Sequence, residues 1–120
     1  MSYDLCLYRP EFLRHAIENN LGDWTDADPI SEEMSDSIVA HLLRQQYSEQ
    51  QYPWLIGRCF SHPDSGLQIE AHLYTGSLVF SVSYGPRSSE AVQVATNEAR
   101  SAAKLFGLGF VDPETGAIVT

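Results

Sequence analysis

The sequence has few basic residues and no long apolar run, and each shortage excludes a class of protein. Seven Lys and Arg residues stand against sixteen Asp and Glu residues, which leaves a formal net charge of -9 over 120 residues. Proteins that bind the phosphate backbone of nucleic acids need a basic surface, so a nucleic-acid partner is not expected. No apolar run approaches the ~20 residues that span a bilayer. The first ten residues also lack the basic and apolar regions of a secretory signal. We therefore expect a cytoplasmic protein without a membrane partner.

Cysteine is also scarce, since Cys6 and Cys59 are the only two in the chain. Neither belongs to a C-x-x-C unit, which argues against a metal knuckle or a redox pair. Both lie in apolar-rich segments that we expect to be strands, and free cysteine is commonly buried. The pattern predicts two buried free thiols. A disulfide between the two strands is the alternative.

The remaining composition is that of an ordinary globular domain. Hydrophobic residues make up 43% of the chain and charged residues 19%, close to average usage in soluble proteins. A chain of this length can bury roughly two-thirds of its unfolded surface, which is enough for one core. No repeat, low-complexity stretch or linker interrupts it. We expect residues 1–120 to form a single domain.

The first half of the chain shows a strand pattern followed by two helical patterns. Residues 2–8 alternate in the manner of a strand, and Pro10 suits the first turn of a helix that ends near residues 19–22. A second helix is predicted after an N-cap at Asp28 or Ser31. The apolar stripe expected for this helix consists of Met34, Ile38, Leu42, Leu43 and Tyr47.

Three strands are predicted next, at residues 54–60, 67–74 and 77–84. Their short, turn-rich connections favour antiparallel pairing. Alternation places Leu67, Ile69, Ala71, Leu73, Leu78, Phe80, Val82 and Tyr84 on one face. The opposite face is expected to be open and polar, with Gln68, Glu70, His72, Ser77, Val79, Ser81 and Ser83.

An alanine-rich helix is predicted over residues 89–106, followed by a short strand, a turn and an apolar end. Gly107 and Gly109 are expected to end the helix with left-handed backbone angles. Its buried side is predicted to hold Ala91, Val94, Ala95, Glu98, Ala99, Ala102, Leu105 and Phe106. The order of elements predicts an α+β fold, a two-layer sandwich in which helices pack on one face of a mostly antiparallel sheet.

The acidic residues are concentrated near the N-terminus. Residues 1–36 contain nine acids and two bases, whereas residues 37–120 contain seven acids and five bases. Such a segment is either a solvated surface or a field that accelerates capture of a basic partner. Trp24, between Asp23 and Asp26, either packs across an end of the core or anchors a partner.

Catalytic signals are sparse. Glu70 and His72 are two residues apart on one strand face, where a carboxylate can orient an imidazole for general-base work; a solvated sheet face is the alternative. The sequence pattern indicates no third metal ligand next to this pair, so no metal site is expected. Gly107-Leu108-Gly109 follows a helix and does not open one, so it does not form a phosphate loop. No cofactor is indicated.

Two stretches carry a family resemblance. The chain opens with MSYDL ahead of a helix that starts with proline, and residues 106–116 read FGLGFVDPETG after an alanine-rich helix. This combination resembles small bacterial immunity proteins encoded beside polymorphic or type VI secreted toxins. The resemblance implies a protein that binds and neutralises a cognate toxin and needs no catalytic residues.

The resemblance and the charge distribution lead to one hypothesis and two alternatives. The expected partner is a cognate toxin with a basic active-site surface. The alternatives are a small hydrolase or isomerase with His72 as base and Glu70 as its orienter, and a homodimeric scaffold joined through the polar sheet face or an edge strand. The partner-binding residues predicted by the first hypothesis are Asp23, Trp24, Asp26, Asp28, Glu32, Glu33 and Asp36, with Glu70 and His72 as a second patch.

Overall fold

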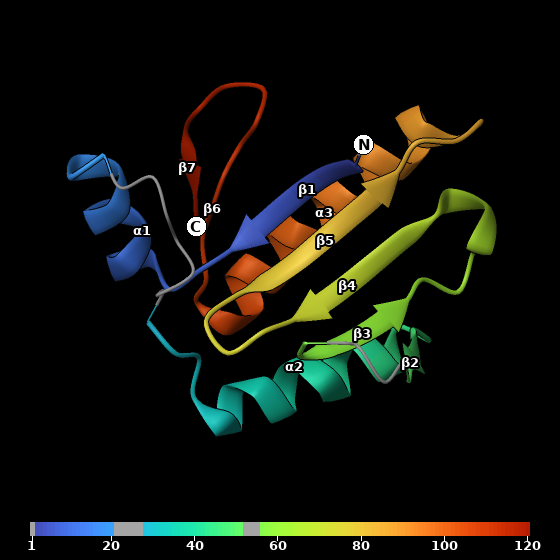
Figure 1. Cartoon of the computed structure of the whole chain (residues 1–120), viewed down its shortest axis with the longest axis horizontal. Helices are drawn as coiled ribbons and strands as arrows, with labels where there is room; N and C mark the ends of the chain where they lie inside the picture. The colour runs from blue at the N-terminus through green and yellow to red at the C-terminus, as the bar shows by residue number, and fades with distance from the viewer. Residues whose placement is uncertain (1, 21–27, 52–55) are drawn as a thin grey trace.

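A five-stranded antiparallel sheet forms the centre of the computed structural model, which describes residues 2–20, 28–51 and 56–120. The strands follow the spatial order β1-β5-β4-β3-β2, so both the first and the second strand of the chain lie at an edge (Figure 1). Their bounds are β1 (Ser2–Leu7), β2 (Ser48–Gln50), β3 (Arg58–Ser61), β4 (Ile69–Leu73) and β5 (Leu78–Ser83).

Helices α2 (Glu32–Arg44) and α3 (Ser88–Phe106) cover one face of this sheet, and the other face is turned toward the viewer in Figure 1. This arrangement confirms the predicted α+β sandwich. Helix α1 (Pro10–Glu18) lies beyond the end of β1, beside the hairpin of β6 (Phe110–Val111) and β7 (Ile118–Val119). None of the helices in the described segments is long and apolar enough to cross a membrane.

The core lies between the sheet and the two covering helices. Ile69, Ala71 and Leu73 of β4 are buried, and Ala71 pairs with the buried Phe80 of β5. The facing side of α3 is lined by small side chains, which let the helix backbone approach the sheet closely. These buried alanines are Ala91, Ala95, Ala99, Ala102 and Ala103.

The ends of two helices follow from local chemistry. Ser31 is the N-cap of α2, and its Oγ accepts a hydrogen bond from the backbone N–H of Met34 at 3.2 Å. This decides between the two predicted caps in favour of Ser31 over Asp28. Gly107 ends α3 with a φ of +64°, as predicted. Gly109 does not adopt positive φ; its backbone instead exchanges two hydrogen bonds with Tyr8, at 2.8 and 2.9 Å.

The predicted stripe of α2 extends too far along the chain. The helix ends at Arg44, and Gln46 takes a φ of +67° that turns the chain away from the helical path. Tyr47 therefore enters the core from the turn after the helix, and Leu43 is exposed.

Two other apolar side chains are exposed, contrary to prediction. Leu105 points to solvent because the last turns of α3 bury Ala102 and Ala103 instead. Tyr84 is exposed because β5 ends at Ser83, and alternation no longer governs the residue that follows.

The strand predicted at residues 54–60 is observed as β3, which starts at Arg58 and runs one residue further. Residues 52–55 lie outside the described segments. Gly57 precedes β3 with a φ of +82°, and a Cβ there would lie 2.5 Å from the carbonyl oxygen of Leu73. Strand β2 was not predicted, because its residues Ser-Glu-Gln have no apolar alternation.

Candidate functional site

The open face of the sheet carries a row of side chains that crosses four strands. The register pairs Cys59 of β3 with His72 of β4, His72 with Val79 of β5, and Val79 with Cys6 of β1. Both cysteines are free thiols, as predicted; Cys59 is buried, whereas Cys6 is only partly buried. The row brings together side chains from segments up to 73 residues apart in the chain.

A second row contains Glu70 and runs parallel to the first. Glu70 pairs with Ser61 of β3 and with Ser81 of β5, and Ser81 pairs in turn with Asp4 of β1. The hydroxyl of Ser81 donates to Asp4 Oδ1 at 2.7 Å. The open face is therefore polar and holds carboxylates in fixed positions, as the strand alternation predicted.

Cys59, Glu70 and His72 form a cluster on this face, which we call the Cys59 cluster. The Cys59 thiol donates to Glu70 Oε2 at 3.3 Å, and Glu70 Oε1 lies 3.9 Å from His72 Nε2. Burial, together with the hydrogen bond to Glu70, raises the pKa of the Cys59 thiol to about 12. The ring of Tyr74 stacks on His72 with 6.1 Å between the centroids. The thiol is thus a neutral donor at physiological pH.

The predicted proximity of Glu70 and His72 is present, but Cys59 was not predicted as their neighbour. Cys59 lies on a different strand, 11 residues before Glu70 in the sequence. The turn-rich stretch between β3 and β4 indicated antiparallel pairing, yet it did not set the register. Only that register places Cys59 opposite His72.

The predicted acidic patch is described in part. Its members Asp28, Glu32, Glu33 and Asp36 are all exposed, and no described base forms an ion pair with any of these four carboxylates. We refer to these four residues as the α2 acids. Three of them are on α2, which packs on the covered face, so the α2 acids and the Cys59 cluster belong to opposite sides of the sheet (Figure 1). The other predicted contacts, at Asp23, Trp24 and Asp26, lie outside the described residues.

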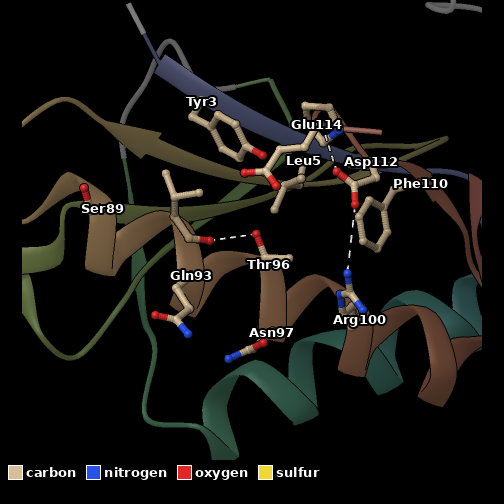
Figure 2. Close-up of a pocket in the computed structure, with 12 residues that line it drawn as sticks. Tyr3, Leu5, Ser89, Gln93, Thr96, Asn97, Arg100, Phe110, Asp112 and Glu114 are labelled. Carbon is tan, nitrogen blue, oxygen red and sulfur yellow. Dashed lines mark hydrogen bonds and ion pairs between the residues drawn. The ribbon is translucent and has the colours of Figure 1, made fainter. Parts of the chain in front are cut away.

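A hollow of about 340 Å³ lies between β1, α3 and the β6–β7 hairpin (Figure 2). Its floor includes Arg100, whose guanidinium lies 3.9 Å from a carboxylate oxygen of Asp112. Figure 2 shows Tyr3 and Glu114 at the same rim. Burial and the nearby carboxylates of Glu114 and Asp112 raise the pKa of Tyr3. The hollow can accept a small polar group.

This hollow was not predicted, because its walls come from the two ends of the chain and from α3. The turn that carries the family resemblance forms part of it. Asp112 accepts a hydrogen bond from the backbone N–H of Glu114 at 2.8 Å, and the Thr115 hydroxyl accepts one from the N–H of Ala117. These residues shape a turn, so their local role is structural.

Comparisons with protein-family models, curated proteins and solved structures give no match to this chain. The function is therefore inferred from the residues and their geometry.

Proposed function

We propose that this chain is a cytoplasmic immunity protein that binds a cognate secreted bacterial toxin and neutralises it by occluding or inactivating it. The observation that supports this most directly is the set of α2 acids. Four exposed carboxylates, none of them in a close ion pair with a described base, gather over the first half of α2 and the residues just before it; Arg58 acts on one of them, Asp36, at longer range. Carboxylates that form no close ion pair within the described residues are available to the basic side chains of another molecule.

The location of the α2 acids suits recognition. Helix α2 is anchored to the core by Ile38 and Leu42, both buried, so its acidic surface is already ordered before a partner arrives. Such preorganisation reduces the entropy lost on association. A concentrated negative field also accelerates encounter with a basic surface. A toxin whose active site binds phosphates or nucleotides would present such a surface.

The test measures binding to the product of the gene immediately upstream, which the proposal expects to be a toxin. We expect association in the nanomolar range that weakens as salt rises, because rim charges are screened. The variant Glu32→Gln/Glu33→Gln/Asp36→Asn should bind about tenfold more weakly, which corresponds to about 1.4 kcal/mol. Its matched control, Glu11→Gln/Glu18→Gln/Glu114→Gln, changes three exposed carboxylates outside α2, makes the same change in net charge and should bind nearly as tightly as the native chain. Equal losses in both variants, or salt-insensitive binding, would contradict a role for the α2 acids.

A second candidate is a small hydrolase or isomerase, and the contact between Glu70 and His72 favours it. In that case His72 acts as a general base and Glu70 orients its ring. Glu70 also lines a hollow of about 230 Å³ with His62 and Ser83. His72→Ala would abolish activity in such an enzyme, whereas it should leave toxin protection nearly intact in an immunity protein whose binding is spread over many contacts.

A further inference from the structure

Three different metal-binding side chains meet on the open face of the sheet. We propose that Cys59, Glu70 and His72 form a binding site for a divalent transition-metal ion, and that Zn²⁺ fits this donor set best. The site does not involve the α2 acids, which belong to the other side of the sheet, but it shares Glu70 and His72 with the second predicted contact patch.

The three donor groups lie close enough together to share one ion. Around a tetrahedral Zn²⁺ with bonds of about 2.0–2.3 Å, neighbouring ligand atoms are about 3.3–3.6 Å apart. Cys59 Sγ and Glu70 Oε2 are 3.3 Å apart, and Glu70 Oε1 and His72 Nε2 are 3.9 Å apart. One donor atom from each of the three residues lies within 4.8 Å of the other two. The two short distances involve different oxygens of Glu70, so binding requires the side chains to turn until one carboxylate oxygen, the sulfur and the nitrogen reach bonding distance together.

The backbone holds these donors in place. Cys59 and His72 are directly paired across β3 and β4, and Glu70 is two residues from His72 on the same strand face. The stacked ring of Tyr74 limits rotation of the His72 imidazole. Binding then costs mainly side-chain entropy, because sheet pairing has already ordered the backbone that carries the ligands.

Burial differs among the ligands in a way that leaves a path for the ion. Cys59 is 1% exposed, whereas the side chains of His72 and Glu70 are 21% and 44% exposed. The sulfur therefore lies at the sheltered end of the cluster, and the carboxylate lies toward solvent. An ion can be captured by Glu70 and His72 before it reaches the thiol.

The donor types select the class of metal. Mg²⁺ and Ca²⁺ prefer oxygen ligands alone, whereas a thiolate and an imidazole suit Zn²⁺ and its neighbours in the first transition row. On binding, the Cys59 S–H bond breaks, a sulfur–metal bond forms and the proton leaves to solvent. The neutral imidazole donates its Nε2 lone pair, and Glu70 donates a carboxylate oxygen. Three protein ligands leave one position for water or an incoming ligand.

The test uses Co²⁺ as a spectroscopic probe added to the full reduced chain. We expect a near-ultraviolet thiolate-to-cobalt absorption together with visible bands of a four-coordinate site. Added Zn²⁺ should displace the Co²⁺ and abolish both signals. A wild-type chain that shows no thiolate band would overturn the proposal.

Matched variants identify the ligands. Cys59→Ser should abolish the thiolate band, whereas Cys6→Ser should retain it. His72→Gln should weaken Co²⁺ binding by at least about 100-fold, because losing a direct ligand costs more than the 10–100-fold typical of outer-shell changes, and His15→Gln should leave it unchanged. Circular dichroism checks that each variant is folded, and Glu70→Gln provides a further ligand test if Cys59→Ser does not fold. A band that survives in folded Cys59→Ser, or affinity unchanged in His72→Gln, would refute the site.

Discussion

Glu49 and Arg58 join the two outermost strands of one sheet edge through a two-pronged ion pair. The Arg58 Nε donates to Glu49 Oε2 at 2.7 Å, and its Nη2 donates to Oε1 at 2.6 Å. The guanidinium also lies 5.5 Å from the centroid of the Phe60 ring. This pair connects β2, a strand of three residues, to β3, and its hydrogen bonds lower the pKa of the Glu49 carboxyl.

Replacing Glu49 by Gln should lower the unfolding free energy at neutral pH and have little effect in acid. Because the folded state lowers the pKa of Glu49, the ionised carboxylate stabilises the fold above the ordinary carboxyl range, and this stabilisation is lost as pH falls through the folded pKa. The pair is partly exposed, so the loss should be about 0.2–1 kcal/mol. Urea unfolding at pH 7 and pH 3 measures it.

Glu11→Gln is the control, since Glu11 and Arg9 are exposed and 3.8 Å apart. Its unfolding midpoint should stay close to that of the native chain at both pH values. A Glu49→Gln variant whose deficit is as large at pH 3 as at pH 7 would argue against the ion pair as the cause.

Removing the buried hydroxyl of Tyr47 should not destabilise the fold. Tyr47 is 3% exposed, and its hydroxyl has no hydrogen-bond partner among the described residues. A buried polar group without a partner costs roughly 1–3 kcal/mol. Tyr47→Phe should therefore be neutral or raise the unfolding free energy by up to about 1 kcal/mol, whereas Tyr47→Ala should lower it by about 3–5 kcal/mol because it leaves a cavity.

Tyr47 should also make the stability of the fold depend on pH in the alkaline range. Burial raises the pKa of Tyr47, so at high pH the unfolded chain releases this proton more readily than the folded chain does. Stability should fall as pH rises past the ordinary tyrosine range, and Tyr47→Phe should reduce that fall. Thermal melts of both proteins between pH 8 and about pH 11 make the comparison. Identical pH profiles would show that Tyr47 does not contribute.

The alanine side of α3 should not tolerate larger residues. Ala95 is fully buried against the sheet, and Ala95→Leu should lower the unfolding free energy by about 1–3 kcal/mol through overpacking. Gln93→Leu is the control, because Gln93 is on the same helix and exposed. Chemical denaturation should separate the two variants, and equal stability would mean that α3 can shift away from the sheet.

Removing the N-cap of α2 should lower the unfolding free energy by less than overpacking the core does. Ser31→Ala removes the acceptor for the Met34 N–H and should cost about 1 kcal/mol. Ser37→Ala is the matched control, since the Ser37 hydroxyl donates to the Glu33 carbonyl within the helix and caps no free group. The urea unfolding midpoint of Ser31→Ala should be lower than that of Ser37→Ala. The reverse order would show that Ser31 does not cap α2.

Local periodicity accounts for what was predicted correctly from the sequence. The alternation of Ile69, Ala71 and Leu73 depends only on the two-residue repeat of a strand, and the spacing of Ala91, Ala95 and Ala99 only on the helical repeat. These patterns were enough for the fold class, and they also placed Glu70 and His72 on a shared face.

Other features depend on which segments meet, and no local pattern encodes that. The strand β2 exists because Ser48–Gln50 finds the exposed edge of β3, although its own side chains carry no strand signal. Leu43 and Leu105 are exposed although they lie within α2 and α3, because each helix turns other residues, Leu42 in α2 and Ala102 and Ala103 in α3, toward the core. The approach of Cys59 to His72 was set by strand register, and a shift of one residue would have turned Cys59 to the other face. The sequence by itself thus determined the elements and the face on which each side chain lies. Only the pairing of distant strands decided that donors from β3 and β4 meet.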